Sequence, residues 1–119
     1  MKYLMLLHDE SSAPNDPGSA EYVATFQAWD AVLQPMREAG VLIDCAPLYP
    51  ADSATTVRVR DGETLLTDGP SAEIKEQVGG YTLVECADLD EALGWAARIP
   101  TAATGSVEVR PVLVVERPS

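Results

Sequence analysis

The first apolar run of the chain, Lys2–His8, ends in the only histidine of the sequence, and Asp9 and Glu10 follow it. Histidine is the side chain that changes charge near neutral pH, which suits it to general acid–base chemistry. The end of a strand that faces a cavity is a frequent position for such a group. His8 is therefore the first candidate catalytic residue. The alternative is a histidine that faces solvent or makes a structural hydrogen bond.

A second candidate lies in the turn sequence Asp68-Gly69-Pro70-Ser71. An aspartate before a Gly-Pro turn can accept backbone N–H groups and cap a short helix, and we expect such a helix within Asp68–Gln77. The same carboxylate can instead serve as an acid or base together with His8. Both roles stay open, so Asp68 is a candidate catalytic residue with capping as its structural alternative.

Polar residues after this turn are candidates for binding a substrate: Glu73, Lys75 and Tyr81. Lys75 would act as a compact point charge that anchors a ligand. Charges on a short polar helix are more often solvated, and solvation is the alternative for Glu73 and Lys75.

Two acidic residues, Glu85 and Glu108, interrupt otherwise apolar strands. Each can point to solvent at a sheet edge. Arg110 follows Glu108 by two residues, so both side chains lie on the same face of an extended strand and can form a pair.

The sequence contains no nucleophile motif, no phosphate-binding loop and no cluster of metal ligands. One histidine and two separated cysteines, Cys45 and Cys86, do not have the spacing of a zinc site. We expect no cofactor and no metal. Both cysteines lie in apolar contexts and are expected to be buried free thiols, with a disulfide as the alternative.

Charge excludes several classes of partner. Nineteen acidic residues against eight basic ones give a net charge of -11, and the basic residues are scattered along the chain. Such a surface repels nucleic acid and anionic membranes. No signal peptide and no run of about 20 apolar residues is present, so we expect a cytoplasmic protein.

The length of 119 residues fits one domain, 1–119, and 46% hydrophobic residues suffice for a core. Strands are predicted at 2–8 and 41–47, separated by a loop at 9–19 and a helix at 20–39 with Gly40 as its C′ residue. The apolar stripe of this helix comprises Tyr22, Phe26, Trp29, Leu33 and Met36. Pro35 should kink the helix without ending it.

In the second half, strands at 55–60 and 64–67 flank Asp61-Gly62-Glu63 and predict a hairpin. A further strand is expected at 80–86. Asp88 and Glu91 start a helix that runs to Arg98, stops at Pro100 and turns Leu89, Leu93 and Ala96 inward. The last strand is expected at 107–115.

The order β-α-β, hairpin, β-α-β predicts an α+β fold of ferredoxin-like type: a split βαβ with an antiparallel sheet, two main helices and an inserted hairpin. The helices would cover one face. The other face is also apolar, since Leu4, Leu6, Val112 and Val114 alternate with equally apolar neighbours. A second subunit is the simplest cover for it, so we expect a homodimer.

The middle of the chain resembles the DGPF branch of the YCII-related proteins. The resemblance rests on Thr67-Asp68-Gly69-Pro70 and on Glu73-Ile74-Lys75-Glu76-Gln77-Val78-Gly79-Gly80-Tyr81, and it extends over residues 2–115. It implies a dimeric α+β barrel. Ser71 stands where the family usually has phenylalanine, and Trp29-Asp30 stands where the YCII branch has a histidine, so the family's His–Asp pair does not transfer directly.

Two functional hypotheses follow. In the first, the domain is dimeric and binds a small organic molecule in a cavity between its helices and its sheet. As an enzyme, it would catalyse cofactor-free proton transfer, isomerisation or elimination with His8 and Asp68 as acid–base groups and Lys75 as anchor. In the second, which the resemblance implies, it is a regulatory domain associated with an extracytoplasmic-function sigma factor.

Overall fold

The computed structural model describes residues 1–10, 14 and 16–119, so part of the loop expected at 9–19 lies outside the described residues. The elements in chain order are β1 (Lys2–Asp9), α1 (Ala20–Glu38), β2 (Leu42–Pro47), the 3-10 helix η1 (Ala51–Ser53), β3 (Thr55–Arg60), β4 (Glu63–Asp68), β5 (Gln77–Glu85), α2 (Leu89–Ala96), α3 (Thr101–Thr104) and β6 (Ser106–Pro111).

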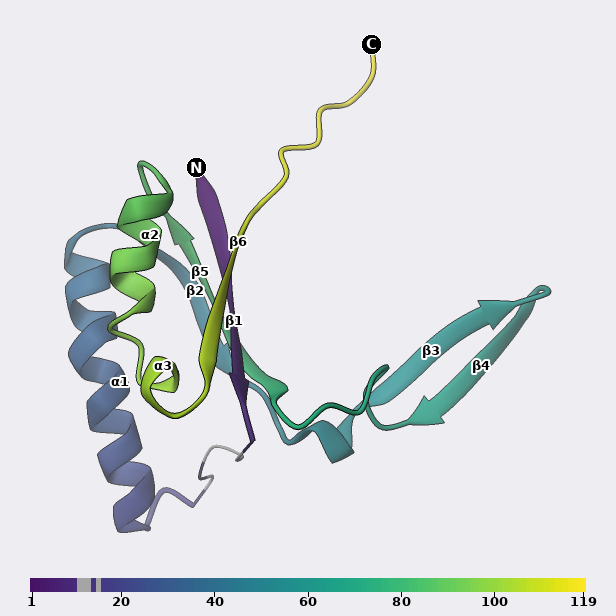
Figure 1. Ribbon diagram of the computed structural model, residues 1–119, viewed down its shortest axis with the longest axis horizontal. Coiled ribbons are helices and arrows are strands. Elements are labelled where there is room, and N and C mark those ends of the chain that lie inside the picture. Colours follow the sequence, from purple (N-terminus) through teal and green to yellow (C-terminus); the bar gives the residue numbers. More distant parts are fainter. Residues whose placement is uncertain (11–13, 15) are drawn as a thin grey trace.

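The main sheet has four strands in the order β2-β5-β1-β6, and all neighbouring strands are antiparallel. Helices α1 and α2 cover one face of this sheet (Figure 1). Strands β3 and β4 form a separate two-stranded sheet between β2 and β5 in the chain. This arrangement confirms the predicted ferredoxin-like α+β fold with an inserted hairpin.

Ser19 caps helix α1, because its side chain accepts the N–H of Tyr22, and the helix continues through Pro35 to Glu38. Gly40 follows with a φ of 73°, a conformation that glycine adopts without steric cost. The buried residues of α1 are Val32 and Met36. Phe26 is 61% exposed, so its place in the predicted stripe is wrong.

Helix α2 starts as predicted, because the Asp88 side chain accepts the N–H of Glu91. Its buried residues are Ala92 and Ala96, whereas Leu89 and Leu93 are exposed. The predicted inward face was therefore wrong for both leucines. Alanines on the inner face let the helix approach the sheet closely, and the helix turns its larger side chains outward.

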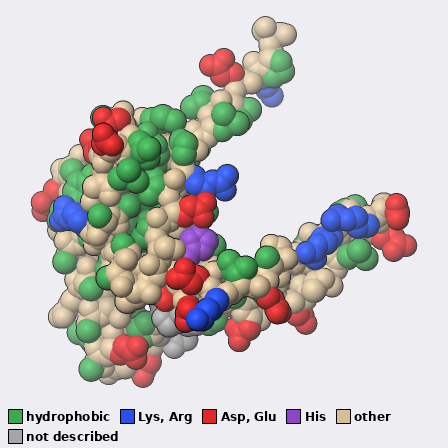
Figure 2. Space-filling model, in the orientation of Figure 1, with side chains coloured by type: hydrophobic (Ala, Val, Ile, Leu, Met, Phe, Trp, Pro, Cys, Tyr) green, Lys and Arg blue, Asp and Glu red, His purple; other side chains and the backbone are tan. Residues whose placement is uncertain are grey.

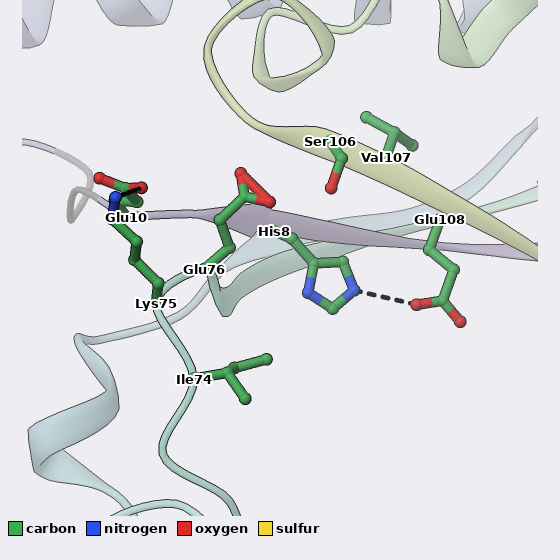
Figure 3. A pocket seen from close by; sticks show the side chains of 8 residues that line it. All are labelled: His8, Glu10, Ile74, Lys75, Glu76, Ser106, Val107 and Glu108. Atoms are coloured by element: carbon green, nitrogen blue, oxygen red, sulfur yellow. Dashed lines mark hydrogen bonds and ion pairs between the residues drawn. The ribbon is translucent and has the colours of Figure 1, made fainter.

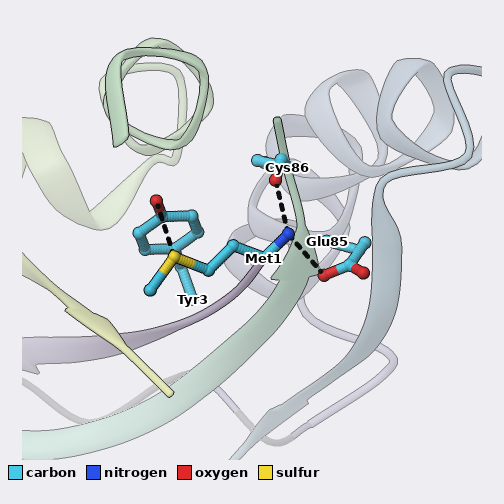
Figure 4. Close-up of polar contacts among 4 residues, drawn as sticks. All are labelled: Met1, Tyr3, Glu85 and Cys86. Carbon is cyan, nitrogen blue, oxygen red and sulfur yellow. Dashed lines mark hydrogen bonds and ion pairs between the residues drawn. The ribbon is translucent and has the colours of Figure 1, made fainter. Parts of the chain in front are cut away.

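The core lies between the helices and the sheet. Alternate residues of β1, namely Tyr3, Met5 and Leu7, point into it and are at most 5% exposed. Val84 of β5 and Ile99 after α2 complete its centre. The start of β1 is fixed to the far end of β5: the ammonium group of Met1 donates to the Cys86 carbonyl at 2.9 Å and lies 3.2 Å from Glu85 (Figure 4).

The last strand is shorter than predicted. β6 ends at Pro111, and beyond it the N–H of Val112 still donates to the Lys2 carbonyl at 2.9 Å. Since β1 begins at Lys2, no residue of β1 remains to pair with the chain beyond Val112. Leu113, Val114 and Val115 are therefore not strand residues, and they are 82%, 79% and 83% exposed.

The hairpin turns at Asp61 and Gly62, with φ values of 52° and 78°. Positive φ at both positions is the type I′ geometry that matches strand twist, so the hairpin prediction is confirmed. The hairpin projects away from the main sheet (Figure 1). The Cα radius of gyration is accordingly 16.6 Å, against about 13.5 Å for a compact domain of this length.

The helix expected after Asp68 is absent: residues 69–76, all of which the structure describes, form bends and irregular loop. Gly69 has a φ of 98°, its N–H donates to the Ala54 carbonyl, and its own carbonyl accepts the Thr56 hydroxyl at 2.7 Å. The proposed capping role of Asp68 is therefore wrong, because Asp68 has no helix to cap. Among the described residues, no helix is long and apolar enough to cross a membrane.

Candidate functional site

The histidine predicted from sequence lies on the helix-free face of the sheet. The cavity expected between the helices and the sheet is therefore wrong, because packed core residues fill that space. His8 Nε2 lies 3.1 Å from Glu108 Oε1 (Figure 3). Strands β1 and β6 pair with Leu6 opposite Glu108 and His8 opposite Ser106. Residues two apart share a face, so the two side chains meet diagonally across neighbouring strands.

Glu108 connects His8 to a cation. Its second oxygen, Oε2, lies 3.8 Å from Arg110 Nε, which confirms the predicted pair. The side chain of His8 is 17% exposed and that of Glu108 is 48% exposed, so the imidazole is the more enclosed partner. In the neutral tautomer with its proton on Nε2, His8 donates to the Glu108 carboxylate and Nδ1 keeps a lone pair. The arrangement suits His8 to accept a proton.

A cleft of about 590 Å³ opens beside this pair. The residues that line it are His8, Glu10, Ile74, Lys75, Glu76, Ser106, Val107 and Glu108 (Figure 3). Lys75 Nζ lies 3.4 Å from Glu10 Oε1. In the space-filling view, the histidine lies in the hollow between the main sheet and the hairpin, with acidic and basic side chains around it (Figure 2).

Two glycines allow close approach of the chain, Gly105 at His8 and Gly80 between β5 and β2. A Cβ on Gly105 would lie 2.0 Å from the His8 carbonyl oxygen, so only glycine fits there. A Cβ on Gly80 would lie 2.8 Å from the Ala46 carbonyl oxygen. The β1–β5 register shifts between Leu7 and His8. Thr104 donates its hydroxyl to Asp9 Oδ2 at 2.8 Å and holds the end of β1.

A second polar pair lies on the same sheet face. The Tyr81 hydroxyl donates to Asp44 Oδ2 at 2.7 Å. This hydrogen bond, more than burial, raises the pKa of Tyr81 above its ordinary value. Tyr81 was a predicted binding residue, whereas Asp44 was not singled out. The only feature of the sequence that could have indicated Asp44 is that it is an acidic residue inside an otherwise apolar strand.

The sequence candidates are only partly brought together. His8 and Lys75 line the same cleft, and Tyr81 shares a sheet face with His8. Asp68 lies at the end of β4 opposite Thr55, on the hairpin, and does not line the cleft. Glu73 is exposed in the following loop and does not line it either. Glu108, Glu10 and Glu76 line the cleft but were not predicted as site residues.

A second cleft, of about 480 Å³, lies at the base of the hairpin. Its lining is mainly apolar and includes Leu48, Tyr49 and Ile74, together with Pro70 and Ser71 of the turn sequence. The Asp-Gly-Pro turn therefore borders this cleft and not the one at His8.

Within residues 1–10, 14 and 16–119, no three His, Cys, Asp or Glu side chains form a group that could hold a metal ion. Both cysteines are free, as expected: Cys86 is buried and Cys45 is half-buried. Burial, reinforced by the Glu91 carboxylate, raises the pKa of the Cys86 thiol to about 11. Burial likewise raises the pKa of Cys45. Protonated thiols at neutral pH are poor nucleophiles.

The fold and this site define a small α+β protein of ferredoxin-like type with a histidine–carboxylate pair on its open sheet face. The YCII-related domain matches residues 1–116, and the chain belongs to the YCII-related family. An uncharacterized protein of Rhizobium meliloti (strain 1021) is 40% identical over 114 residues, which cover 94% of this chain and 92% of that protein.

A solved structure with a similar fold is 5-chloro-2-hydroxyhydroquinone dehydrochlorinase from Burkholderia phenoliruptrix AC1100, in complex with 2,5-dihydroxybenzoquinone. The two chains superpose with a TM-score of 0.50 and 17% sequence identity, over 95% of this chain and 94% of that one. At this identity, the likeness shows the shared fold.

Proposed function

We propose that this protein binds a small organic molecule in the cleft at His8 and catalyses a cofactor-free proton transfer of the isomerase or lyase type. The observation that carries the proposal is the 3.1 Å contact between His8 Nε2 and Glu108 Oε1 at the edge of the cleft. A histidine oriented by a carboxylate is a recurrent arrangement of general bases.

The chemistry follows from the free lone pair of His8. The imidazole takes a proton from a carbon beside a carbonyl. In an isomerisation the electron pair of that C–H bond forms a C=C bond to the carbonyl carbon, the C=O π electrons move onto the oxygen, and the proton returns at another atom. In an elimination the same electron pair forms a C=C bond to the adjacent carbon, from which a leaving group departs with its own bonding electrons. The fold supports this chemistry, since the similar structure is a dehydrochlorinase.

In this proposal Glu108 takes the carboxylate role that was expected of Asp68, because Asp68 lies on the hairpin. Lys75, paired with Glu10, anchors a polar group of the ligand at the far side of the cleft. Three carboxylates, Glu10, Glu76 and Glu108, line the cleft against Lys75 and His8. Their charge disfavours phosphate and carboxylate ligands and favours an uncharged one.

The proposal includes a second copy of the chain as the cover of the helix-free face. Leu4, Leu6 and Leu83 of that face are only half-buried. Val57, Val59 and Leu66 of the hairpin are 60%, 59% and 68% exposed. An isolated two-stranded hairpin is marginally stable in water, so an apolar partner for it is expected. A symmetric homodimer supplies one.

Chemical-shift mapping tests where ligands bind. With uniformly labelled protein, 4-methylphenol should perturb the signals of His8 and Val107, which line only the first cleft, while leaving Thr64 near the hairpin tip unchanged. His8→Gln should weaken the binding, whereas Glu116→Gln, in the exposed C-terminal segment, should not. Shifts confined to Ala51 and Ser53 would place the ligand in the second cleft and refute the site at His8.

A further inference from the structure

We propose that residues 112–116 of one copy, here called the C-terminal segment, dock as a third strand along β3 of the hairpin of a second copy, and that the two copies exchange these segments reciprocally. This inference rests on the homodimer of the proposed function and names the segment that completes its interface.

The C-terminal segment is a strand without a partner. Leu113, Val114 and Val115 form an apolar run rich in β-branched residues, a composition typical of strands, and each is at least 79% exposed. The Val112 N–H donates to the Lys2 carbonyl. Beyond it, the segment forms no backbone hydrogen bond with residues 1–10, 14 and 16–119.

The hairpin lacks a third strand. In the part of the chain that the structure describes, β3 and β4 pair only with each other. A two-stranded sheet is marginal in water, whereas three strands with a hydrophobic face are stable. Val57 and Val59 share one face of the hairpin with Leu66, which lies opposite Val57. All three are about 60% exposed or more, so this face requires an apolar cover.

The C-terminal segment cannot reach the hairpin of its own chain. Val112 lies at the Lys2 end of β1, whereas the hairpin joins the sheet at the other end, where Asp9 pairs with Gln77 of β5. The two ends of β1 are about 23 Å apart, and four residues after Val112 extend about 13 Å. The hairpin projects still further from the sheet (Figure 1).

A second copy brings the two surfaces together. In a two-fold symmetric pair whose helix-free faces oppose each other with antiparallel β1 strands, the Lys2 end of one copy lies at the Asp9 end of the other. Each C-terminal segment then extends beyond its own sheet towards the hairpin of the other copy. The exchange is reciprocal, so it closes as a dimer and leaves neither segment unpaired.

The alternation of the segment matches that of β3. Leu113 and Val115 are two residues apart, so they share a face and can extend the apolar face of Val57 and Val59. Val114 and Glu116 then lie on the opposite face of the hairpin.

Charge selects β3 over β4. The opposite face of β3 carries Arg58 and Arg60, and basic side chains gather along the hairpin in the space-filling view (Figure 2). Neither arginine forms an ion pair with a described residue. Glu116 would lie beside these cations on β3, whereas on β4 it would meet Glu63 or Asp68. An exposed pair of this kind adds little energy but favours one edge over the other.

Docking on the hairpin also bears on the cleft at His8. Strand β4 leads into the loop that carries Ile74, Lys75 and Glu76 to that cleft. The Arg58 guanidinium donates to the Ser71 carbonyl at 3.5 Å and so joins β3 to the same loop. A third strand that orders the hairpin therefore also positions Lys75.

Isotope-filtered NMR tests the contact directly. In a dimer mixed from labelled and unlabelled copies, the filtered nuclear Overhauser effects arise only between copies. We expect them between the methyl groups of Leu113 or Val115 and those of Val57 or Val59. Their absence in a dimeric sample would refute the docking.

Leu113→Asp tests the energetic role of the segment, because it places a charge in the apolar contact. It should raise the dissociation constant of the dimer, measured by sedimentation, by about tenfold or more. Amide hydrogen exchange of β3 should accelerate by a similar factor, since the edge amides lose their hydrogen-bond partners. Leu89→Asp, the same change at a leucine 46% exposed on α2, should alter neither quantity. Equal effects of the two variants would overturn the inference.

The outcomes separate this inference from the proposed function. A dimeric parent in which residues 112–116 do not contact β3 refutes the docking and leaves the homodimer and the site at His8 standing. A monomeric parent refutes the docking and the second copy together, while binding at His8 is judged separately with His8→Gln. Assemblies that grow beyond a dimer with concentration would show open docking from copy to copy and contradict the reciprocal exchange.

Discussion

His8 and Glu108 are 100 residues apart in the chain, yet their side chains meet at 3.1 Å. The antiparallel register of β1 and β6 brings them together, with Leu6 opposite Glu108 and His8 opposite Ser106. A shift of this register by one residue would send Glu108 to the helix-covered face. The pair therefore depends on the packing at the end of β1, and that packing is the first target for mutation.

Gly105→Ala should destabilise the protein and disturb His8. The added Cβ would lie 2.0 Å from the His8 carbonyl oxygen, so the β1–β6 end must shift. We expect a loss of about 1–3 kcal/mol in the free energy of unfolding, as for other overpacked sites. Urea denaturation measures it. Gly94→Ala in α2 is the matched control: nothing lies within 4 Å of its added Cβ, and it should gain about 0.5–1 kcal/mol. Equal effects of the two changes would refute the steric account.

Asp68 and Asp88 should respond differently to alanine. Asp88 caps α2 through the N–H of Glu91 at 2.9 Å, so Asp88→Ala should cost about 0.5–2 kcal/mol. Asp68 is exposed at the end of β4 and caps no helix in 69–76, a described segment, so Asp68→Ala should change stability by less than about 0.5 kcal/mol. Melting temperatures of the two variants decide the matter. A larger loss at Asp68 would restore a structural role for this residue.

Cys86 should make stability fall at alkaline pH. Its thiol pKa is raised from 9.0 to about 11, chiefly by burial, so the folded state holds the proton more tightly than the unfolded state. The resulting stabilisation is fully present below pH 9 and is lost as pH rises through 11. Urea denaturation at pH 8 to 11 should show a smaller decline for Cys86→Ala than for the parent. Parallel curves would contradict the raised pKa.

The homodimer is tested by light scattering after size exclusion. The expected mass is twice the 12.7 kDa of the chain. Leu66→Glu, which places a charge on the exposed apolar face of the hairpin, should shift the protein towards the monomer, whereas Glu63→Gln near the hairpin tip should not. A monomeric parent at micromolar concentration would remove the second copy from the proposed site.

Local patterns predicted most of the fold because they report local geometry. Apolar runs, and a period of two at 80–86, predicted the strands, and Asp61-Gly62 has the positive φ values that the hairpin turn needs. Errors arose where the spacing of apolar residues was used to choose a helix face. Phe26, Leu89 and Leu93 were expected inside but are exposed, whereas Ala96 is buried as predicted and Ala92 is buried beside it. The phase of a short helix is set by its packing distance, which the sequence does not specify.

The site was harder to predict, because its contacts join distant segments. His8 was found from its residue type and its position at the end of a strand. Glu108 and Asp44 were not, since each becomes a partner only through strand register. Asp68 was favoured by its turn sequence, but Gly69 at positive φ leads the chain into a loop instead of a helix.

The central claim is that His8 transfers a proton. Its most direct test is the exchange of the α-protons of cyclohexane-1,4-dione, an uncharged enolisable ring, for deuterium, followed by proton NMR. The parent protein should accelerate the exchange, and His8→Gln should reduce the acceleration by about 10²-fold or more, the range of general acid–base catalysis. Glu108→Gln should reduce it in part, and Glu116→Gln should not. If His8→Gln exchanges the probe as fast as the parent does, His8 is not the base and the account is wrong.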